Sequence, residues 1–373
     1  MSGEAKARRD RVAARLRDEG LAAVLVEDAE GRRDFSLRYL TGQPGDAVLL
    51  VAADGRSILV AWDVNMARLR ADADEILAYS DFERQPARAL AGMLERLGIP
   101  AGSRVELPST TAYPRYVDFV EALPGYDLVC RDDGMDAFIL SLRAVKDPGE
   151  LALYRRAAAI TDALIGRLED AVRSGEARSE TDVALLIERE CRAAGCEGTG
   201  FETLAAGPSR SFGIHAFPPF GAGPFGSEGT SILDFGVKLE GYSTDVTMTF
   251  VRGELGHERE RMLELVLEAR KAALAAVKPG ARTRDCALAA DAVFTAGGLA
   301  MPHALGHGIG LWEHEAPAIR SRADNEDLFQ VGQVVAIEPG LYHPELGGIR
   351  FEDDYIVTEA GAEQLTHSRI VRL

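Results

Sequence analysis

The chain has few cysteines and no long apolar run. Its four cysteines, Cys130, Cys191, Cys196 and Cys286, are spread over 373 residues without a CxxC spacing. They give no sign of a disulfide framework, and reduced thiols in a cytoplasm are the economical interpretation. No segment approaches the roughly 18 consecutive apolar residues of a membrane span, and the first ten residues contain no apolar signal core. We therefore expect a cytoplasmic protein without a membrane partner.

Basic residues are scarce relative to acidic ones. The chain has 42 Lys and Arg against 59 Asp and Glu, a formal net charge of −17. Such a charge opposes binding to a phosphate backbone, so we expect no nucleic-acid partner. Residues 221–226 do satisfy the GxGxxG pattern of nucleotide-binding proteins. They precede a predicted strand instead of joining a strand to a helix, so no helix N-terminus would meet a phosphate, and we reject this pattern as a nucleotide site.

Two aspartates lie in neighbouring segments that are rich in β-branched and aromatic residues. Asp234 lies within residues 231–236 and Asp245 within residues 241–250, and both segments are predicted strands with a turn between them. If the hairpin folds about residues 239 and 240, Asp234 lies directly opposite Asp245. Opposed Cβ atoms are roughly 5 Å apart, and like charges there are destabilising. Two anions at such positions indicate that a cation lies between them.

The same arrangement is predicted near the C-terminus. Glu338 lies within the apolar segment 334–339 and Glu352 within 349–357, with a turn-like stretch between them. Folding about residue 345 places Glu338 opposite Glu352. A surface pair of carboxylates is the ordinary explanation for one such arrangement. Two pairs with apolar flanks indicate a metal centre instead.

One histidine is a candidate partner for these four carboxylates. His303 and His307 have the i, i+4 spacing of a helical zinc motif, but Gly306, Gly308 and Gly310 surround His307. Each glycine inside a helix costs about 1 kcal/mol relative to alanine, so a strand or tight loop is predicted, with both histidines on one face. A lone histidine is more often structural than a ligand. Here the glycine backbone can approach a ligand closely, which favours His307 as a neutral metal ligand.

These residues, in this order, resemble the pita-bread metallopeptidases, the family that contains methionine aminopeptidase, aminopeptidase P and prolidase. The matching motifs are the two aspartates eleven residues apart, Gly-His-Gly-Ile-Gly, Ile-Glu-Pro-Gly and Arg-Phe-Glu-Asp-Asp. The resemblance covers about residues 140–373. It implies that two divalent metal ions are bound, with Asp245 and Glu352 bridging them. The implied metal ligands are Asp234, Asp245, His307, Glu338 and Glu352.

The implied ligand set suits two divalent cations. Four carboxylates carry roughly four negative charges, and a mostly oxygen set with one imidazole suits Mn²⁺, which we expect first, or Co²⁺, Zn²⁺ or Fe²⁺. The absence of a thiolate argues against a structural zinc site. Metals roughly 3.5–4 Å apart can share a water, lower its pKa and present hydroxide at neutral pH. Glu338 is the expected proton shuttle beside that nucleophile.

Three further histidines match positions of the family outside the ligand set. His215 stands in Phe-Gly-Ile-His-Ala-Phe, where the family places a histidine that contacts the substrate near the scissile bond. His314 lies in Trp-Glu-His-Glu-Ala-Pro, and His303 matches a position prominent in the prolidase and aminopeptidase P branch. The family often has a proline directly before the first of these histidines, whereas this chain has Ile214 there and an aromatic-rich stretch, 217–225, after it. That departure affects the substrate pocket and not the metal ligands.

One arginine completes the candidate site. Arg350 precedes Glu352 by two residues, so the two share a strand face. Arg350 is therefore suited to orient a metal-binding carboxylate or Asp234. The expected catalytic residues are His215, His303, His314, Glu338 and Arg350.

The chain divides near residue 140. Residues 1–140 alternate predicted helices and strands, and Asp54-Gly55 is a strong hairpin signal. This α/β part resembles the amino-terminal domain of creatinases, aminopeptidase P and prolidases, notably at residues 37–42. Residues 141–373 are the expected pita-bread catalytic domain, an α+β fold with helix pairs covering an antiparallel sheet. Its first helix begins with a capping box at Asp147 and Glu150, and Ser179 caps the second.

The resemblance implies a dimetal exopeptidase that hydrolyses the Xaa-Pro bond at the amino end of dipeptides or short peptides. The expected partners are a short peptide with proline at its second position and a second copy of the chain in a homodimer. A physical reason supports proline: an Xaa-Pro amide lacks an N–H, so a site must hold it by ring packing and carbonyl contacts.

Three alternatives are kept open. An aminopeptidase of other specificity would have the same fold. A creatinase-like hydrolase of a small non-peptide C–N bond would as well, although such enzymes typically lack the metal ligands and all five are present here. The third alternative is a non-catalytic binding module, against which the ligands and the accompanying histidines argue.

Overall fold

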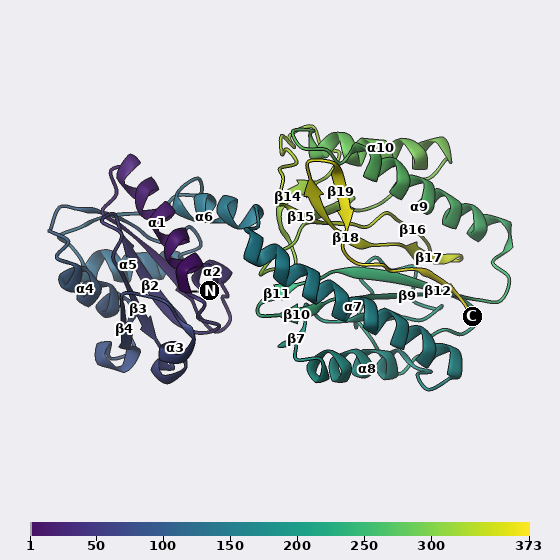
Figure 1. Cartoon of the computed structure of the whole chain (residues 1–373), viewed down its shortest axis with the longest axis horizontal. Coiled ribbons are helices and arrows are strands. Elements are labelled where there is room, and N and C mark those ends of the chain that lie inside the picture. The colour runs from purple at the N-terminus through teal and green to yellow at the C-terminus, as the bar shows by residue number, and fades with distance from the viewer. Residues whose placement is uncertain (1) are drawn as a thin grey trace. The chain divides into compact units, whose positions relative to one another are not determined.

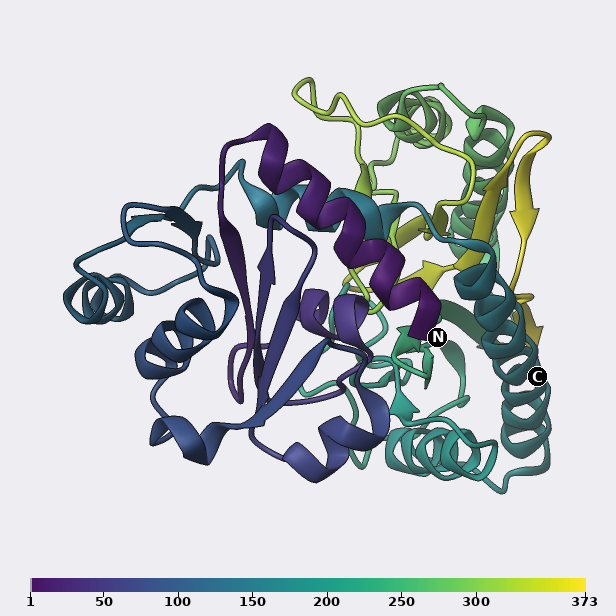
Figure 2. The same cartoon turned by 60° about the vertical axis from the view of Figure 1, so that its left-hand side comes forward.

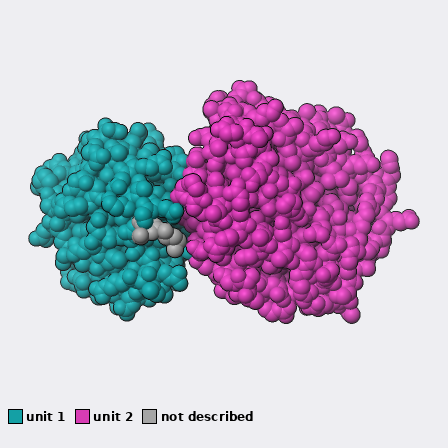
Figure 3. Space-filling model, viewed as in Figure 1, with its two compact units in different colours: residues 1–143 teal, residues 144–373 magenta. Residues whose placement is uncertain are grey.

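The computed structural model describes residues 2–373. The chain forms two compact units, unit 1 up to Arg143 and unit 2 from Ala144 to Leu373 (Figure 3). Among the described residues, none of the helices combines the length and the apolar character that crossing a bilayer requires.

Unit 1 is built on one mixed sheet. In spatial order its strands are β4 (Glu75–Ala78), β3 (Ser57–Ala61), β2 (Ala47–Ala52), β1 (Ala23–Asp28), β5 (Arg104–Glu106) and β6 (Asp127–Val129). β2 and β3 form an antiparallel hairpin, as the Asp54-Gly55 signal predicts. Gly55 has a φ of 92°, a conformation that glycine adopts without steric cost. Both central strands are buried along their whole length, which matches a sheet covered on both faces.

Helices cover the two faces of that sheet (Figures 1 and 2). The helices are α1 (Ser2–Asp18), α2 (Phe35–Thr41), α3 (Val64–Arg70), η1 (Tyr79–Phe82), α4 (Pro86–Leu97), α5 (Tyr113–Ala122) and α6 (Met135–Ala144). Leu25 and Leu50 pack with Leu90 and Phe119 in one core beneath α4 and α5. α1 lies on the opposite face (Figure 2). Unit 1 therefore has the α/β architecture that the sequence predicts.

Unit 2 opens with two long helices and repeats this arrangement later in the chain. The helices are α7 (Pro148–Ser174), α8 (Glu180–Ala193), α9 (Gly256–Ala276) and α10 (Thr283–Ala296). The capping box that the sequence predicts at Asp147 and Glu150 is present, and Ser179 caps α8 by accepting a hydrogen bond from the backbone of Asp182. These caps satisfy backbone N–H groups that have no partner inside a helix, which fixes where both helices begin.

The strands of unit 2 lie between these helix pairs (Figure 1). They form four sheets: β11 (Tyr242–Ser243), β10 (Val237–Leu239) and β7 (Gly198–Thr199); β20 (Ile370–Arg372), β12 (Val246–Arg252), β9 (Gly229–Phe235) and β8 (Leu204–Ala206); β14 (Glu315–Ile319), β13 (Gly306–Gly308), β15 (Val334–Ile337), β18 (Asp353–Thr358) and β19 (Gly361–Gln364); β16 (Gly340–His343) and β17 (Gly347–Arg350). Val266 of α9 and Phe294 of α10 pack on Val335 and Ile337 of β15 in the core. The predicted α+β architecture, antiparallel strands covered by helices, is confirmed.

The register of the first carboxylate hairpin corrects the prediction. Asp234 pairs with Thr247 and not with Asp245. The turn is made by Glu240 and Gly241, both with positive φ, one residue later than predicted. A shift of the turn by one residue moves the pairing by two and leaves the strand face unchanged. Asp245 is therefore the diagonal neighbour of Asp234 on the same face, a separation that side chains still bridge.

The register of the second carboxylate hairpin agrees with the prediction. Ile337 pairs with Asp353, and Gly340 pairs with Arg350. The hairpin therefore folds about residue 345, and the same register on both flanks places Glu338 opposite Glu352. His307 lies at the centre of the short strand β13, between β14 and β15, so the prediction of a strand in place of a helix is also confirmed.

Candidate metal centre

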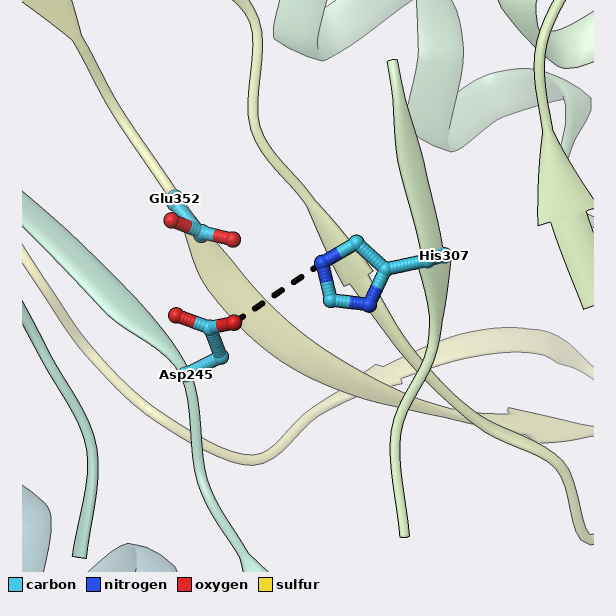
Figure 4. A group of neighbouring side chains, drawn as sticks. All are labelled: Asp245, His307 and Glu352. Atoms are coloured by element: carbon cyan, nitrogen blue, oxygen red, sulfur yellow. Dashed lines mark ion pairs between the residues drawn. The ribbon is translucent and has the colours of Figure 1, made fainter. Parts of the chain in front are cut away.

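Three predicted ligands converge from three separate segments of unit 2. Asp245 lies between β11 and β12, His307 in β13, and Glu352 between β17 and β18. One ligand atom from each lies within 4.8 Å of the others. Figure 4 shows the three side chains pointing toward one another, with Nε2 of His307 3.7 Å from Oδ2 of Asp245. This spacing leaves room for a cation between them.

Glu338 joins this group through two histidines. Its Oε1 lies 3.8 Å from Nε2 of His307, and its Oε2 lies 3.8 Å from Nδ1 of His303. The His307 ring is itself oriented by the backbone oxygen of Gly308, 3.1 Å from Nδ1. Such a contact on the far ring nitrogen leaves Nε2 directed at the carboxylates, an arrangement typical of metal-binding histidines.

Arg350 holds the remaining aspartate. Its Nη2 donates to Oδ2 of Asp234 at 2.5 Å, and the guanidinium is 1% exposed. The other oxygen of Asp234, Oδ1, is buried without a hydrogen-bond partner, and so is Oδ1 of Asp245. Arg350 thus orients Asp234 as the sequence predicts, and it leaves one oxygen directed elsewhere.

Thr247 links this arginine to the second hairpin. Its hydroxyl donates to Oε2 of Glu352 at 2.6 Å and accepts from Nε of Arg350 at 2.8 Å. Thr247 is fully buried, and its backbone forms a bridge with Glu352. One threonine therefore sets the rotamers of a predicted ligand and of the arginine that supports another.

The clustered carboxylates are electrostatically costly. Burial raises the pKa of Asp245 well above its usual range, and Glu352 and Asp234 raise it further. Burial, followed by Glu338 and Asp234, does the same for Glu352, and burial raises the pKa of Glu338 to about 7. Burial also lowers the pKa of His307 to about 4, which keeps its ring neutral.

These features fit divalent cations. A charged group is buried in proteins when it is paired or coordinates a metal, and two oxygens here lack a partner in the protein. The donor set is mainly carboxylate oxygen with one neutral imidazole, which suits Mn²⁺, Co²⁺, Zn²⁺ or Fe²⁺. The residues that would hold the ions are Asp234, Asp245, His307, Glu338 and Glu352.

The other predicted catalytic histidines surround this group. His215 is exposed on the loop between β8 and β9. Burial raises the pKa of Asp234, whereas Arg350 and then His215 lower it, so His215 lies close to that carboxylate. The ring centroid of His314 is 4.3 Å from that of His307. His303 accepts or donates through Nε2 to the hydroxyl of Tyr342 at 3.1 Å, and burial lowers its pKa to about 4.

Two supporting residues are missed by the sequence analysis. The Tyr342 hydroxyl lies 3.0 Å from Nη1 of Arg350 as well as beside His303. It lies on β16 four residues after Glu338, so period-two counting along the predicted hairpin could have found it. Asp354, fully buried, accepts from the backbone N–H of Asp245 at 3.0 Å. That contact joins the two hairpins, and no local pattern signals it.

His343 lies outside this group. It is exposed at the end of β16, and its Nδ1 accepts from the backbone N–H of Glu345. It stabilises the turn of the second hairpin and does not face the carboxylates of the site.

Comparison with known proteins identifies the family. The model of metallopeptidase family M24 matches residues 152–359, and the creatinase/prolidase N-terminal domain matches residues 8–145. The chain belongs to metallopeptidase family M24. Enzymes of this class bind divalent metal ions, in agreement with the group of Asp245, His307 and Glu352.

Individual relatives match over nearly the whole chain. The protein YkvY of Bacillus subtilis (strain 168), provisionally named a dipeptidase, is 32% identical over 365 residues, which cover 95% of this chain and 96% of that protein. The X-Pro aminopeptidase from Thermotoga maritima MSB8 has a TM-score of 0.85 at 26% identity and covers 98% of this chain and 99% of its own. The Xaa-Pro dipeptidase from Bacillus anthracis has the same TM-score and identity and covers 99% and 100%.

Replacing Thr247 with valine is expected to weaken metal binding by about 10- to 100-fold, because the ligand Glu352 and the support Arg350 lose their shared hydroxyl. The exchange nearly conserves volume, so the fold is retained. Titration calorimetry of the metal-free protein with Mn²⁺ measures the change.

Thr249→Val is the matched control. Thr249 lies on the same face of β12 and is equally buried, but its hydroxyl contacts only the backbone of Arg350. We expect it to lower thermal stability without changing the Mn²⁺ affinity by more than about threefold. Equal affinities of the Thr247→Val variant and the unmodified protein would contradict the role given to Thr247.

Proposed function

We propose that this protein is a dimetal-dependent exopeptidase that hydrolyses the N-terminal Xaa-Pro bond of dipeptides or short peptides. The observation that carries the proposal is the buried group of Asp245, His307 and Glu352. It occurs in a chain that is similar over its whole length to an X-Pro aminopeptidase and an Xaa-Pro dipeptidase. In this proposal residues 141–373 are the catalytic domain and residues 1–140 the creatinase-type domain.

The side chains divide the chemistry among them. When bound, divalent ions at this site supply Lewis acidity and activate water as a nucleophile. Glu338 accepts the proton of the attacking water, because its carboxylate faces the centre of the site beside His307 and His303. His215, exposed next to Asp234, donates an N–H to the scissile carbonyl oxygen as negative charge develops there.

The remaining residues orient these groups. Arg350 fixes Asp234 and, through Nη1, contacts the backbone oxygen of Ile214 at 3.0 Å. His303 is held by Tyr342 on one side and by the backbone oxygen of Ala304 on the other. His314 packs against the ring of His307 and restrains it.

Aromatic side chains beside His215 support a preference for proline. Phe212 is 43% exposed and Phe217 is 93% exposed. A tertiary Xaa-Pro amide has no N–H to offer, so packing on the pyrrolidine ring is the main way to recognise it. The two phenylalanines on the His215 loop are suited to that contact.

We further propose Mn²⁺ as the native metal, a homodimer as the assembly and the cytoplasm as the location. The oxygen-rich donor set supports Mn²⁺. The dimer follows from the resemblance to the prolidase and aminopeptidase P branch. The four cysteines, none of them in a disulfide, fit a reducing compartment.

Peptide specificity is tested with three substrates on the Mn²⁺-loaded protein: alanylproline, alanylalanine and alanylprolylglycine. We expect kcat/KM for alanylproline to exceed that for alanylalanine by about 100-fold or more, because only the proline substrate suits a site without a partner for an amide N–H. The ratio of dipeptide to tripeptide rates distinguishes a dipeptidase from an aminopeptidase. Faster cleavage of alanylalanine would overturn the assignment to Xaa-Pro bonds.

A further inference from the structure

The loop of residues 207–224, which carries His215, is tied at both ends to one buried carboxylate. Glu180 is the first residue of α8 and is 1% exposed. Its Oε1 accepts from the backbone N–H of Gly207 at 2.8 Å, and its own N–H donates to the backbone oxygen of Gly223 at 3.0 Å. The start and the end of the loop therefore meet at the N-terminus of the helix.

Arg210 joins the loop to the same carboxylate from within. Its Nε lies 3.0 Å from Oε1 of Glu180 and its Nη2 lies 2.8 Å from Oε2, a bidentate pair. Nη1 donates to the backbone oxygen of Pro218 at 2.7 Å. Planar bidentate pairs of arginine and carboxylate fix geometry as well as contribute energy. The guanidinium thus connects helix α8 to the segment directly after His215.

Glycines make room for this carboxylate. A Cβ added at Gly221 or Gly223 would lie 3.4 Å from a Glu180 oxygen, and one at Gly207 would lie 3.3 Å from it. Gly207 would also clash with the backbone oxygen of Pro224 at 2.1 Å. The glycines of the GxGxxG-like stretch are therefore explained by close packing on Glu180 and not by a nucleotide.

The other side of the loop is held by the candidate metal centre. Nη1 of Arg350 donates to the backbone oxygen of Ile214, the residue before His215. The hydroxyl of Ser211 accepts from the backbone N–H of Gly348 on β17 at 3.2 Å. Contacts from the hairpin of Glu338 and Glu352 and contacts from α8 thus hold His215 between them.

We infer that Glu180 and Arg210 are positioning residues for His215, and that they determine how well this histidine is placed against the scissile carbonyl. The inference rests on the proposed function. Neither residue contacts the metal-binding group, so their effect passes through the loop alone. A displacement of about 1 Å at a catalytic group can cost about 100-fold in rate.

The test uses two variants of the full-length, Mn²⁺-loaded protein. Arg210→Gln removes the charge, whereas Arg210→Lys keeps the charge and loses the bidentate geometry. With alanylproline, we expect Arg210→Gln to lower kcat by about 30- to 100-fold and to change KM by less than about threefold. Arg210→Lys is expected to fall between this variant and the unmodified protein. Bound Mn²⁺ stays at the unmodified level in both.

A double-mutant cycle separates positioning from general stability. In a His215→Ala background, Arg210→Gln is expected to lower kcat by less than about threefold, because the histidine that it positions is already absent. A structural role would lower kcat to the same extent in both backgrounds and would contradict the inference. Arg372→Gln is the matched control, because Arg372 forms an equivalent bidentate pair with Glu260 away from the loop. It is expected to leave kcat unchanged.

A second readout does not depend on turnover. Hydrogen exchange of Arg210→Gln is expected to increase in peptides covering residues 207–224 and to stay unchanged in β13 and β17. Unmodified protein that cleaves no Xaa-Pro peptide would refute the proposed function. Unmodified protein that cleaves it, together with an Arg210→Gln variant of unchanged kcat and unchanged exchange, would refute this inference alone.

Discussion

Replacing Asp245 with asparagine is expected to lower kcat/KM for alanylproline by about 1,000-fold or more. Asp245 is central to the group with His307 and Glu352, and the resemblance gives it a bridging role. The substitution removes a negative charge and an oxygen ligand while keeping the shape of the side chain. Lewis-acid stabilisation of the transition state is worth several kcal/mol, which corresponds to a factor of this size.

The control for this variant is Asp285→Asn. Asp285 is exposed on α10, where it pairs with Arg282 at 3.0 Å. Its replacement is expected to change kcat/KM by less than about twofold, because an exposed ion pair contributes little. Metal analysis of both proteins should show fewer ions per chain in Asp245→Asn only. An Asp245→Asn enzyme with normal kcat/KM would contradict the metal role of this hairpin.

Removing the metal ions is expected to lower the melting temperature of the catalytic unit by about 10 °C or more. Without cations, the carboxylates of Asp234, Asp245, Glu338 and Glu352 lie close together and repel one another. A ligand at 100 times its Kd stabilises the folded state by about 2.7 kcal/mol per site, and 1 kcal/mol shifts the melting temperature of a domain this size by about 2–4 °C. Calorimetry before and after chelation measures the shift.

The same repulsion predicts an inversion in the metal-free state. Metal-free Asp245→Asn is expected to melt a few degrees above the metal-free unmodified protein, because it carries one buried charge fewer. With Mn²⁺ present the order reverses, since the variant binds the ions less tightly. Identical melting temperatures with and without chelator, after metal analysis has verified removal, would contradict the account.

Sequence patterns predict the second hairpin better than the first. Alternating apolar residues on both sides of residue 345 leave one register that keeps Glu338 and Glu352 on the same face, and the structure has it. In the first hairpin, Glu240 and Gly241 both adopt positive φ. A non-glycine residue in that conformation is uncommon, so the turn was predicted one residue early. The face of Asp245 was still correct, because such a shift preserves parity.

Contacts between distant segments explain what the sequence analysis missed. Asp354 accepts from the backbone of Asp245, 109 residues away in the chain, and Arg210 pairs with Glu180, 30 residues away. These contacts depend on how α8 and the two hairpins pack, which no local period reveals. Local rules did predict the caps at Asp147 and Ser179, because a cap involves residues three positions apart.

The measurement that tests the central claim most directly is hydrolysis of alanylproline by metal-stripped protein, with and without added Mn²⁺. The account predicts release of alanine only after Mn²⁺ is added, with two ions bound per chain, and no comparable restoration in Asp245→Asn. Full turnover by verified metal-free protein would contradict the role of the two carboxylate hairpins. Two bound ions per chain without any hydrolysis would contradict the Xaa-Pro substrate instead.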